Sequence, residues 1–563
     1  MVSTSTRAEP PVVQPSPTPN RPPSVSTNTS TMRFVLQRVR GFHSLPPISR
    51  SISRGVTLVI FMVAASVWRG AGALAMVAIE AGKRATGNPQ AAPRRQSRRM
   101  AFLGITVMPE YIQTEGVEPL LDNLARAGVT AVATSPYVMA PADEATGVRE
   151  PPGDAEAGKV RLLDRPLWGR RALFVRTAPS FVPDRSLYRG LRYQPSAPDG
   201  LGTAEGGIVA DFIAAAKARG LEVHLQVQAA IPPGYRVQFG GPLDDDLACL
   251  PDGSPLGARV DKNGSLASPH IQAYGCALIR DLVRAYPAID ALRVDWPEYP
   301  PYSFASLFTD FSGHAEAAAG ELGFDFAAMR ADVLALFREL GGKLEDGDLE
   351  AALAPDAGYW LLRRLARRPA ILAWLRFKAA LSLRLLAAYH AVLNDAGGGR
   401  IAFVPHAFPP PWSLLSGFDY AAASAHCDGI GVKLYTMHWP MMLRGYGEAL
   451  LAKNPRLSEA LLARCLARLC DVRDDGPAQI GDFAYPEPDE AHPVGAGAQA
   501  RKITRARAEA RVPVYAFAHG YGPTEDVAAR MAVAWRASDR RMWVNRYGYL
   551  RDAKLDALGA LPR

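Results

Sequence analysis

Residues 289–302 read IDALRVDWPEYPPY, and this stretch decides how the rest of the chain is interpreted. It begins as an apolar strand and then places Arg293, Asp295 and Glu298 within six positions, among aromatic residues. A buried strand has no use for so many charged side chains, so we expect them where the strand ends. In parallel α/β proteins, functional residues gather at the carboxyl ends of the strands. The stretch therefore predicts a parallel α/β fold with a polar site at this strand end.

Short apolar runs of strand type recur along residues 101–563, and helical patterns separate most of them. Eight such alternations predict a (β/α)8 TIM barrel. A doubly wound open sheet is the main alternative, but no glycine-rich phosphate loop follows the first run. The eight runs are 101–107, 129–135, 221–228, 289–295, 400–406, 429–435, 512–519 and 541–549.

Three long insertions interrupt the predicted barrel. Residues 139–203 follow the second strand and residues 231–267 follow the third, so we expect both to build the rim of the site. The third insertion, residues 471–500, precedes the seventh strand and is rich in Pro, Gly and acidic residues. The sequence thus predicts a TIM barrel with long loop insertions.

The positive charge of the chain is concentrated near its start. The net charge is +9, but residues 1–100 contain 14 Lys and Arg and two acidic residues, which leaves 50 basic and 53 acidic residues in 101–563. Nucleic-acid binding requires a basic face on the fold, so we expect no nucleic-acid partner. The five cysteines form no CxxC pair, and we expect free thiols rather than a disulfide framework or a zinc site.

Residues 1–100 are predicted to form a disordered, basic extension, because residues 1–31 are rich in Ser, Thr and Pro. Residues 56–68 are an apolar run of 13 residues, which is short for a membrane span of about 20 residues and typical of a signal-peptide core. If residues 33–75 act as a signal, the protein is exported or membrane-anchored, and this segment is its membrane contact. If the chain starts at Met100, directly before the first strand, the protein is cytoplasmic.

Polar and aromatic residues recur at the predicted strand ends, and this recurrence predicts one polar pocket lined by aromatic rings. Taken singly, each residue also fits a core or salt-bridge role. The histidines lack HxH or HExxH spacing, so no metal site is predicted. The residues that we expect to bind substrate are Glu110, Tyr137, His224, Gln226, Arg293, Trp296, His406, Lys433, Tyr435, Trp439, His519, Tyr521, Asn545, Arg546 and Tyr547.

Asp295 and Glu298 are the candidate catalytic residues. Arg293 lies two positions before Asp295, hence on the same side of the strand, and would keep that carboxylate ionised, as a nucleophile or electrostatic stabiliser requires. Glu298 would be the general acid, with a pKa raised by partial burial. Two carboxyl groups beside aromatic rings suit the cleavage of glycosidic bonds. The alternatives are an ion pair within the barrel and a solvated acid in a loop.

The segment 289–326, IDALRVDWPEYPPYSFASLFTDFSGHAEAAAGELGFDF, resembles the strand-four region of the hypothetical glycosyl hydrolase families, particularly the group numbered six. LPDGSPL at 250–256, the segment 261–287, FAHGYGP at 517–523 and MWVNRYGYLRDAKLDAL at 542–558 fit the same layout. The resemblance covers residues 101–560. It implies a TIM barrel related to glycoside hydrolases, in families whose members mostly lack a demonstrated activity.

Comparison with two better-known patterns leaves open which residue supplies the second catalytic carboxyl group. Arg293-Val294-Asp295 resembles the Arg-x-Asp of the amylase-like retaining hydrolases, in which the Asp is the nucleophile. Strand five here ends VPHAF, without the acidic glutamate of those enzymes. In the barrel glycosidases with two catalytic glutamates, Glu298 would be the first, but the nearest acids after strand seven, Glu525 and Asp526, are expected to start the next helix.

Three functions follow from these observations. The leading hypothesis is a carbohydrate-active hydrolase that cleaves oligo- or polysaccharides with Asp295 and Glu298 and needs no cofactor. The second is a catalytically inactive barrel that binds glycans through its aromatic residues. The third is a metal-dependent hydrolase that uses the histidines.

Overall fold

The computed structural model describes residues 101–150, 164–169, 173–197, 199–236, 240–257 and 263–562. The predicted extension 1–100 lies outside these ranges, and so does its apolar run 56–68. Within the described ranges, no helix combines the length and the apolar character needed to cross a membrane.

Eight parallel strands close into a barrel, in which the last strand pairs with the first. Every strand lies at one of the predicted apolar runs, so the predicted TIM barrel is confirmed and the doubly wound alternative is wrong. The eighth strand is shorter than predicted, because η7 (Tyr547–Tyr549) replaces its end. In barrel order, the strands are β1 (Phe102–Thr106), β2 (Ala131–Thr134), β6 (Glu222–Gln228), β7 (Ala291–Asp295), β8 (Ala402–Ala407), β9 (Ile430–Leu434), β10 (Val514–His519) and β11 (Arg541–Asn545).

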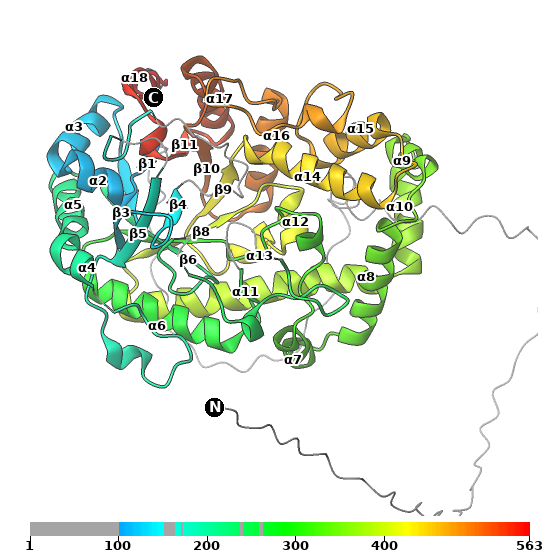
Figure 1. The fold of residues 1–563 in the computed structure, drawn as a ribbon, viewed down its shortest axis with the longest axis horizontal. Helices are drawn as coiled ribbons and strands as arrows, with labels where there is room; N and C mark the ends of the chain where they lie inside the picture. The colour runs from blue at the N-terminus through cyan, green and yellow to red at the C-terminus, as the bar shows by residue number, and fades with distance from the viewer. Residues whose placement is uncertain are drawn as a thin grey trace, which may run out of the picture. The chain divides into compact units, whose positions relative to one another are not determined.

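Helices surround this barrel (Figure 1). Capping residues in the sequence mark the starts of several helices. At the start of α6, Ser268 accepts a hydrogen bond from the backbone N–H of Ile271, and Pro269 occupies the first helical position. The helices of at least ten residues are α3 (Val117–Arg126), α5 (Gly207–Ala218), α6 (Pro269–Ala285), α7 (Gly313–Leu322), α8 (Phe326–Leu340), α10 (Ala357–Arg367), α11 (Ala370–Gly397), α14 (His438–Lys453), α15 (Glu459–Cys470), α16 (Ala496–Glu509) and α17 (Thr524–Ala537). The shorter helices are α2 (Pro109–Glu115), α4 (Gly200–Glu205), α9 (Asp346–Leu353), α12 (Trp412–Ser416), α13 (Tyr420–Ala423) and α18 (Asp552–Gly559).

The insertions contain little regular structure. The insertion after β2 forms a small antiparallel sheet from β3 (Tyr137–Ala142), β5 (Leu173–Pro179) and β4 (Val148–Glu150). The insertion after β6 contains the 3-10 helix η4 (Asp244–Asp246), and the one before β10 contains η6 (Ile480–Asp482). Two further 3-10 helices are η3 (Arg185–Tyr188) and η5 (Ala305–Phe308).

Large aromatic rings fill the barrel interior and face small residues on neighbouring strands. Trp543 packs over Gly104, and Phe517 packs over Gly431. A Cβ atom at either glycine would overlap the facing ring, so a larger residue at those positions must displace that ring. The rings of Trp543 and Phe517 close the barrel interior below the polar side chains at the strand ends, and we call them the barrel floor.

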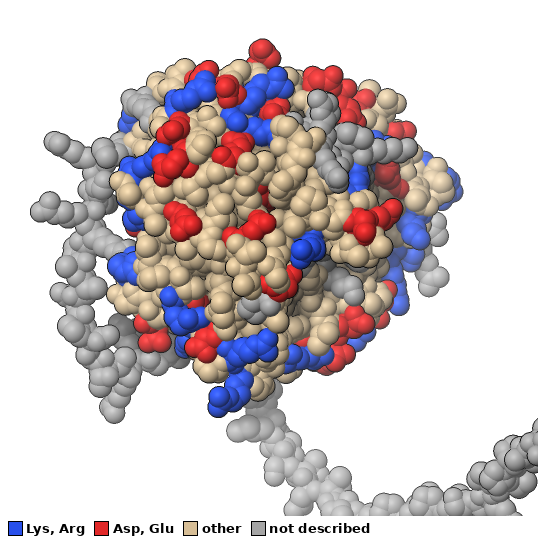
Figure 2. All heavy atoms as spheres, turned by 60° about the vertical axis from the view of Figure 1, so that its left-hand side comes forward, with Lys and Arg blue, Asp and Glu red and all other residues tan. Residues whose placement is uncertain are grey.

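Charged residues of both signs are interspersed over the face displayed in Figure 2. The five cysteines are free thiols, as predicted.

Candidate active site

Asp295 lies at the carboxyl end of β7 and is the centre of the site. In the barrel register it is level with Gln228 on β6 and His406 on β8. The Nζ atom of Lys433, on β9, lies 2.9 Å from Oδ1 of Asp295, and Nδ1 of His406 lies 3.7 Å from the same oxygen. The side chain of Asp295 is 13% exposed, whereas Lys433 and His406 are buried. Asp295 is therefore the group of this cluster that a ligand in solvent contacts.

The Asp295 carboxylate is held in its ionised form. Burial raises the pKa of Asp295, but the charge of Lys433 and the imidazole of His406 outweigh it and keep the pKa well below its usual range. The side chain is thus an anion over the whole physiological pH range, as a nucleophile or a stabiliser of positive charge must be.

Arg293 has a different role from the one predicted. We expected it to keep Asp295 ionised, but Lys433 provides that contact. Arg293 is fully buried in the barrel interior, where its guanidinium packs over the rings of Phe517 and Trp543 and burial lowers its pKa to about 9. Its Nε donates a hydrogen bond to Nε2 of His406 at 2.8 Å.

This hydrogen bond fixes the imidazole of His406. Because Nε2 accepts from Arg293, the ring proton is on Nδ1, the nitrogen that faces Asp295. Burial, together with the charge of Arg293, lowers the pKa of His406 to about 3, so the ring is neutral. Arg293 therefore acts on Asp295 through His406.

Glu298 is completely buried beside this cluster. Its Oε1 accepts a hydrogen bond from the backbone N–H of Phe408 at 2.6 Å and lies 3.9 Å from Nζ of Lys433. Its Oε2 forms a short hydrogen bond with the hydroxyl of Ser416. Burial raises the pKa of Glu298 to about 7, against the opposing effects of Lys433, Ser416 and Phe408.

The hydrogen bonds around Ser416 fit a protonated Glu298. The Ser416 hydroxyl is also within 3.0 Å of the carbonyl of Ser413, and its single proton cannot serve two acceptors. If Glu298 is protonated, it donates to Ser416, which donates to Ser413, and every atom has a partner. The burial of Glu298 exceeds the partial burial that the sequence predicted.

Six aromatic side chains form an arc along the carboxyl ends of the strands. Successive ring centroids are 5.0–5.8 Å apart. Trp296 starts the arc with a φ of 55°, a conformation that bulky residues rarely adopt, and its backbone N–H donates to Oδ1 of Asp295 at 3.1 Å. In order, the aromatic arc consists of Trp296, Tyr302, His438, Tyr435, His519 and Tyr549.

An ionic cluster connects the first two strand ends with β11. Glu110 accepts hydrogen bonds from Tyr137 and from Arg236, each at 2.8 Å. Arg236 also lies 2.6 Å from Glu150, which forms an ion pair with Arg546 at 3.2 Å. The sequence predicted Glu110, Tyr137 and Arg546 but missed Arg236 and Glu150, which lie in the long insertions, where no motif marks them.

Asn545 joins the aromatic arc, since its side-chain amide donates to the hydroxyl of Tyr435 at 3.2 Å. Tyr521 is next to the last member of the arc: its ring packs against Tyr549, and its hydroxyl donates to the carbonyl of Pro486.

Four other predicted residues lie away from Asp295. His224 is near the start of β6 and hydrogen-bonds Glu222, and Gln226 is level with Arg293 in the barrel interior. Trp439 is buried on α14 and packs against Trp412. The hydroxyl of Tyr547 donates to Glu115 on α2. Position near a strand end was the basis of the prediction, and it does not distinguish these four residues from the residues of the arc.

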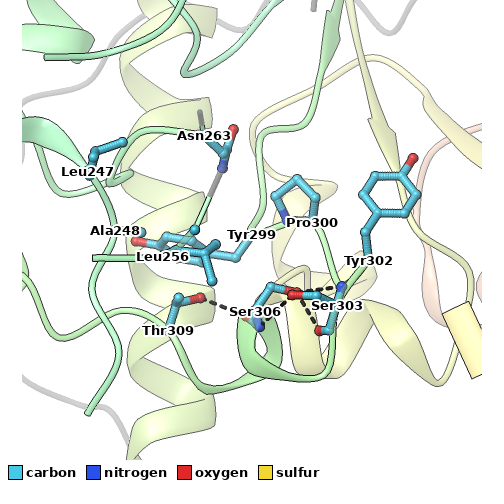
Figure 3. Close-up of a pocket in the computed structure, with 11 residues that line it drawn as sticks. Leu247, Ala248, Leu256, Asn263, Tyr299, Pro300, Tyr302, Ser303, Ser306 and Thr309 are labelled. Atoms are coloured by element: carbon cyan, nitrogen blue, oxygen red, sulfur yellow. Dashed lines mark hydrogen bonds between the residues drawn. The ribbon is translucent and has the colours of Figure 1, made fainter. Parts of the chain in front are cut away.

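A small pocket lies beside Tyr302, between the insertion after β6 and the loop after β7 (Figure 3). Its volume of about 40 Å³ holds roughly three water molecules or one small polar group. The side-chain amide of Asn263, 8% exposed, has no hydrogen-bond partner within the described part of the chain for either of its polar atoms. The pocket lining comprises Leu247, Ala248, Leu256, Gly257, Asn263, Tyr299, Pro300, Tyr302, Ser303, Ser306 and Thr309.

The fold and site together define a closed (β/α)8 barrel with an ionised carboxylate and an aromatic arc at its mouth. No protein-family model matches the sequence, and no curated protein matches it. Three solved structures illustrate the similarity of the chain to known folds. One is the β-galactosidase from the psychrophilic Marinomonas ef1, at 11% identity over 81% of this chain and 58% of that one, with a TM-score of 0.41.

The second is the catalytic domain of β-amylase from Paenibacillus polymyxa, at 11% identity over 81% of this chain and 94% of that one, with a TM-score of 0.39. The third is a chitinase from Chromobacterium violaceum ATCC 12472, at 9% identity over 82% of this chain and 100% of that one, with a TM-score of 0.34. Such low values carry no argument about function, and the resemblance to group six of the hypothetical glycosyl hydrolases stays a prediction.

Proposed function

We propose that this protein is a carbohydrate-active hydrolase that cleaves glycosidic bonds at Asp295. The observation that carries the proposal is a solvent-reachable carboxylate, ionised by its contact with Lys433 at 2.9 Å, beside an arc of six aromatic side chains at the mouth of a barrel.

The aromatic arc suits a sugar ligand, because a sugar ring has apolar C–H faces and polar edges. Aromatic rings bury the faces, and their polar groups hydrogen-bond the hydroxyls. Tyr435 and His438, the half-buried members of the arc, offer both kinds of contact. The Asn263 amide adds a donor and an acceptor in the pocket beside Tyr302.

Asp295 is proposed to act on the anomeric carbon. The transition state of glycoside cleavage resembles an oxocarbenium ion, and a fixed carboxylate stabilises its positive charge or attacks it as a nucleophile. Lys433 keeps Asp295 ionised, and Arg293 fixes the His406 ring, whose Nδ1 faces Asp295 at 3.7 Å.

Glu298 is the proposed second carboxyl group. With a pKa of about 7 it is mostly protonated below neutral pH, as a general acid must be. For Glu298 to protonate the leaving oxygen, its hydrogen bond with Ser416 must be exchanged for one with the substrate.

The burial of Glu298 supports a second candidate function, a barrel that binds glycans without cleaving them. A general acid must come within hydrogen-bond reach of the leaving oxygen, and no part of the Glu298 side chain contacts solvent. In that case the aromatic arc binds sugars without any need for the Asp295 carboxylate.

Sugar release from a panel of oligo- and polysaccharides separates the two functions. We expect the full chain to release sugar from at least one substrate and Asp295→Asn to lose activity on the order of 10³-fold, or about 4 kcal/mol of transition-state stabilisation. Glu298→Gln should lose activity as well if Glu298 is the acid. The control is Glu525→Gln, an exposed acid on α17, which should keep full activity. Glycan binding without release, unchanged in Asp295→Asn, would favour the binding protein.

A further inference from the structure

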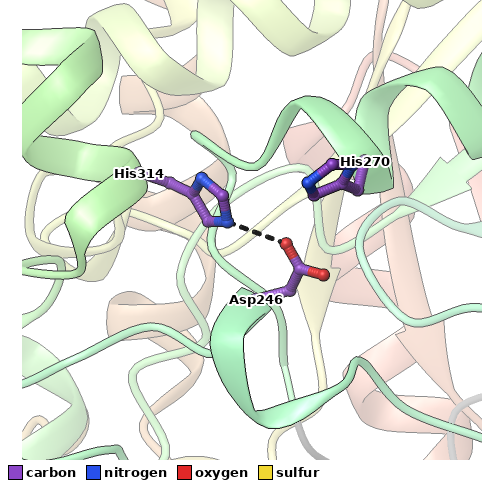
Figure 4. Close-up of side chains that lie close together, drawn as sticks. All are labelled: Asp246, His270 and His314. Carbon is purple, nitrogen blue, oxygen red and sulfur yellow. Dashed lines mark ion pairs between the residues drawn. The ribbon is translucent and has the colours of Figure 1, made fainter. Parts of the chain in front are cut away.

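Asp246, His270 and His314 converge outside the aromatic arc (Figure 4). They come from three segments: η4 in the insertion after β6, the first turn of α6 and the first turn of α7. One ligand atom from each residue lies within 4.8 Å of the other two. Two imidazoles and one carboxylate are a donor set that transition metals use.

The carboxylate of Asp246 is built into the fold. It is fully buried, Tyr193 donates a hydrogen bond to Oδ2 at 2.7 Å, and Ser268 donates to Oδ1. These two hydrogen bonds give the Asp246 carboxylate a fixed orientation. The nearby guanidinium of Arg192 lies 3.5 Å from Oδ2, whereas Oδ1 faces His314.

The two imidazoles complete the group on its solvent side. Nε2 of His314 lies 2.9 Å from Oδ1 of Asp246, and the ring of His270 is 5.8 Å from that of His314, centre to centre. The side chain of His314 is 23% exposed and His270 is half-buried, so an ion from solvent can approach both. Their backbones are fixed, because Ser268 and Ser312 cap the two helices.

We propose that Asp246, His270 and His314 bind a divalent transition-metal ion, with Zn²⁺ the best match. Zinc binds imidazole nitrogen and carboxylate oxygen at about 2.1 Å in tetrahedral geometry, so neighbouring ligand atoms around the ion are about 3.4 Å apart. The Oδ1–Nε2 separation of 2.9 Å is that of a direct ion pair, and it must widen by about 0.5 Å to admit the ion. His270 offers the third ligand atom, within 4.8 Å of the other two. Ser268 and Tyr193 then serve as the outer hydrogen bonds that orient a metal-bound carboxylate.

The ion would stabilise the rim of the barrel. Asp246 is followed directly by Leu247 and Ala248, which line the pocket beside Tyr302. A metal at Asp246 joins this wall of the pocket to the starts of α6 and α7. This metal site goes beyond the proposed function and does not depend on it, since it does not include Asp295 and is tested by metal binding.

The test is a titration of the full chain, stripped with EDTA and desalted, with ZnCl2 in a calorimeter. We expect one saturable site, and we expect His270→Ala and His314→Ala, which each remove a direct ligand, to weaken it by at least about 100-fold. Co²⁺ in place of Zn²⁺ should give a visible absorption band that His270→Ala abolishes. Thermal unfolding should shift upward with Zn²⁺ in the unmodified chain and not in His270→Ala.

His390→Ala is the matched control. His390 also faces a carboxylate, with Nε2 3.7 Å from Oδ2 of Asp428, but this pair has no third ligand among the described residues. It should leave zinc binding unchanged. The far-ultraviolet circular dichroism of each variant checks its folding. The inference is overturned if the chain shows no saturable site, or if a folded His270→Ala binds Zn²⁺ as the unmodified chain does, which would indicate adventitious metal only.

Discussion

Replacing Lys433 by Met tests the electrostatic basis of the site most sharply. Methionine keeps most of the side-chain volume and removes the charge that lies 2.9 Å from Asp295. At an effective dielectric constant of about 20, two unit charges at this distance attract each other by about 6 kcal/mol. The loss of one partner from a buried ion pair typically costs about 3–5 kcal/mol, and we expect Lys433→Met to lower the free energy of unfolding by this amount at pH 7.

The pH dependence of stability should change sign as well. In the unmodified chain the folded-state pKa of Asp295 is depressed, so its contribution is present above the unfolded pKa of about 3.9 and is lost as the pH falls through the folded value. Without Lys433, only the weaker effect of His406 opposes burial, and we expect burial to raise the folded pKa of Asp295 above the unfolded one. Lys433→Met should therefore lose stability as the pH rises from 4 to 7.

Urea unfolding, followed by circular dichroism at pH 4, 5.5 and 7, measures both effects. Asp295→Asn removes the charge that Lys433→Met leaves unpaired, so the double variant should recover at least half of the lost stability at pH 7. Lys502→Met is the control, because Lys502 is equally buried but donates to the carbonyls of Pro410 and Cys470. It should destabilise the protein without rescue by Asp295→Asn. A Lys433→Met variant within about 0.5 kcal/mol of the unmodified chain, or a double variant without recovery, would refute the reasoning.

Two further predictions concern Glu298 and the barrel floor. The folded pKa of Glu298 is raised from 4.5 to about 7, so its contribution to stability is present below pH 4.5 and is lost as the pH rises through 7. Glu298→Gln should therefore gain up to about 3 kcal/mol relative to the unmodified chain between these pH values in urea unfolding, and equal pH profiles would contradict a raised pKa. Gly431→Ala should lower the free energy of unfolding by about 1–3 kcal/mol, because the new methyl group overlaps the ring of Phe517. Gly445→Ala on α14 meets no neighbouring atom and should be neutral or stabilising, and equal effects of the two alanines would show that the floor has room.

The barrel was predictable from the sequence because each of its strands is a short apolar run between helical patterns. Asp295, His406, Lys433 and Tyr435 were predictable for the same reason, since each stands at or next to a strand end where chain order alone implies proximity.

The partners within the site could not be predicted in this way. A spacing of two residues places Arg293 and Asp295 on one side of β7, but it does not show that Lys433, two strands further around the barrel, supplies the charge. The burial of Glu298 depends on Ser416, 118 positions later in the chain. Arg236 and Glu150 come from insertions without periodicity, so their meeting depends on the tertiary fold.

The most direct test of the central claim compares binding and turnover of one oligosaccharide by the full chain and by Asp295→Asn. If Asp295 carries out the chemistry, the variant binds the sugar with an affinity within about threefold of the unmodified chain and releases product on the order of 10³-fold more slowly. Product release at the unmodified rate by Asp295→Asn would contradict the account, because the ionised carboxylate at the barrel mouth would then have no part in the reaction.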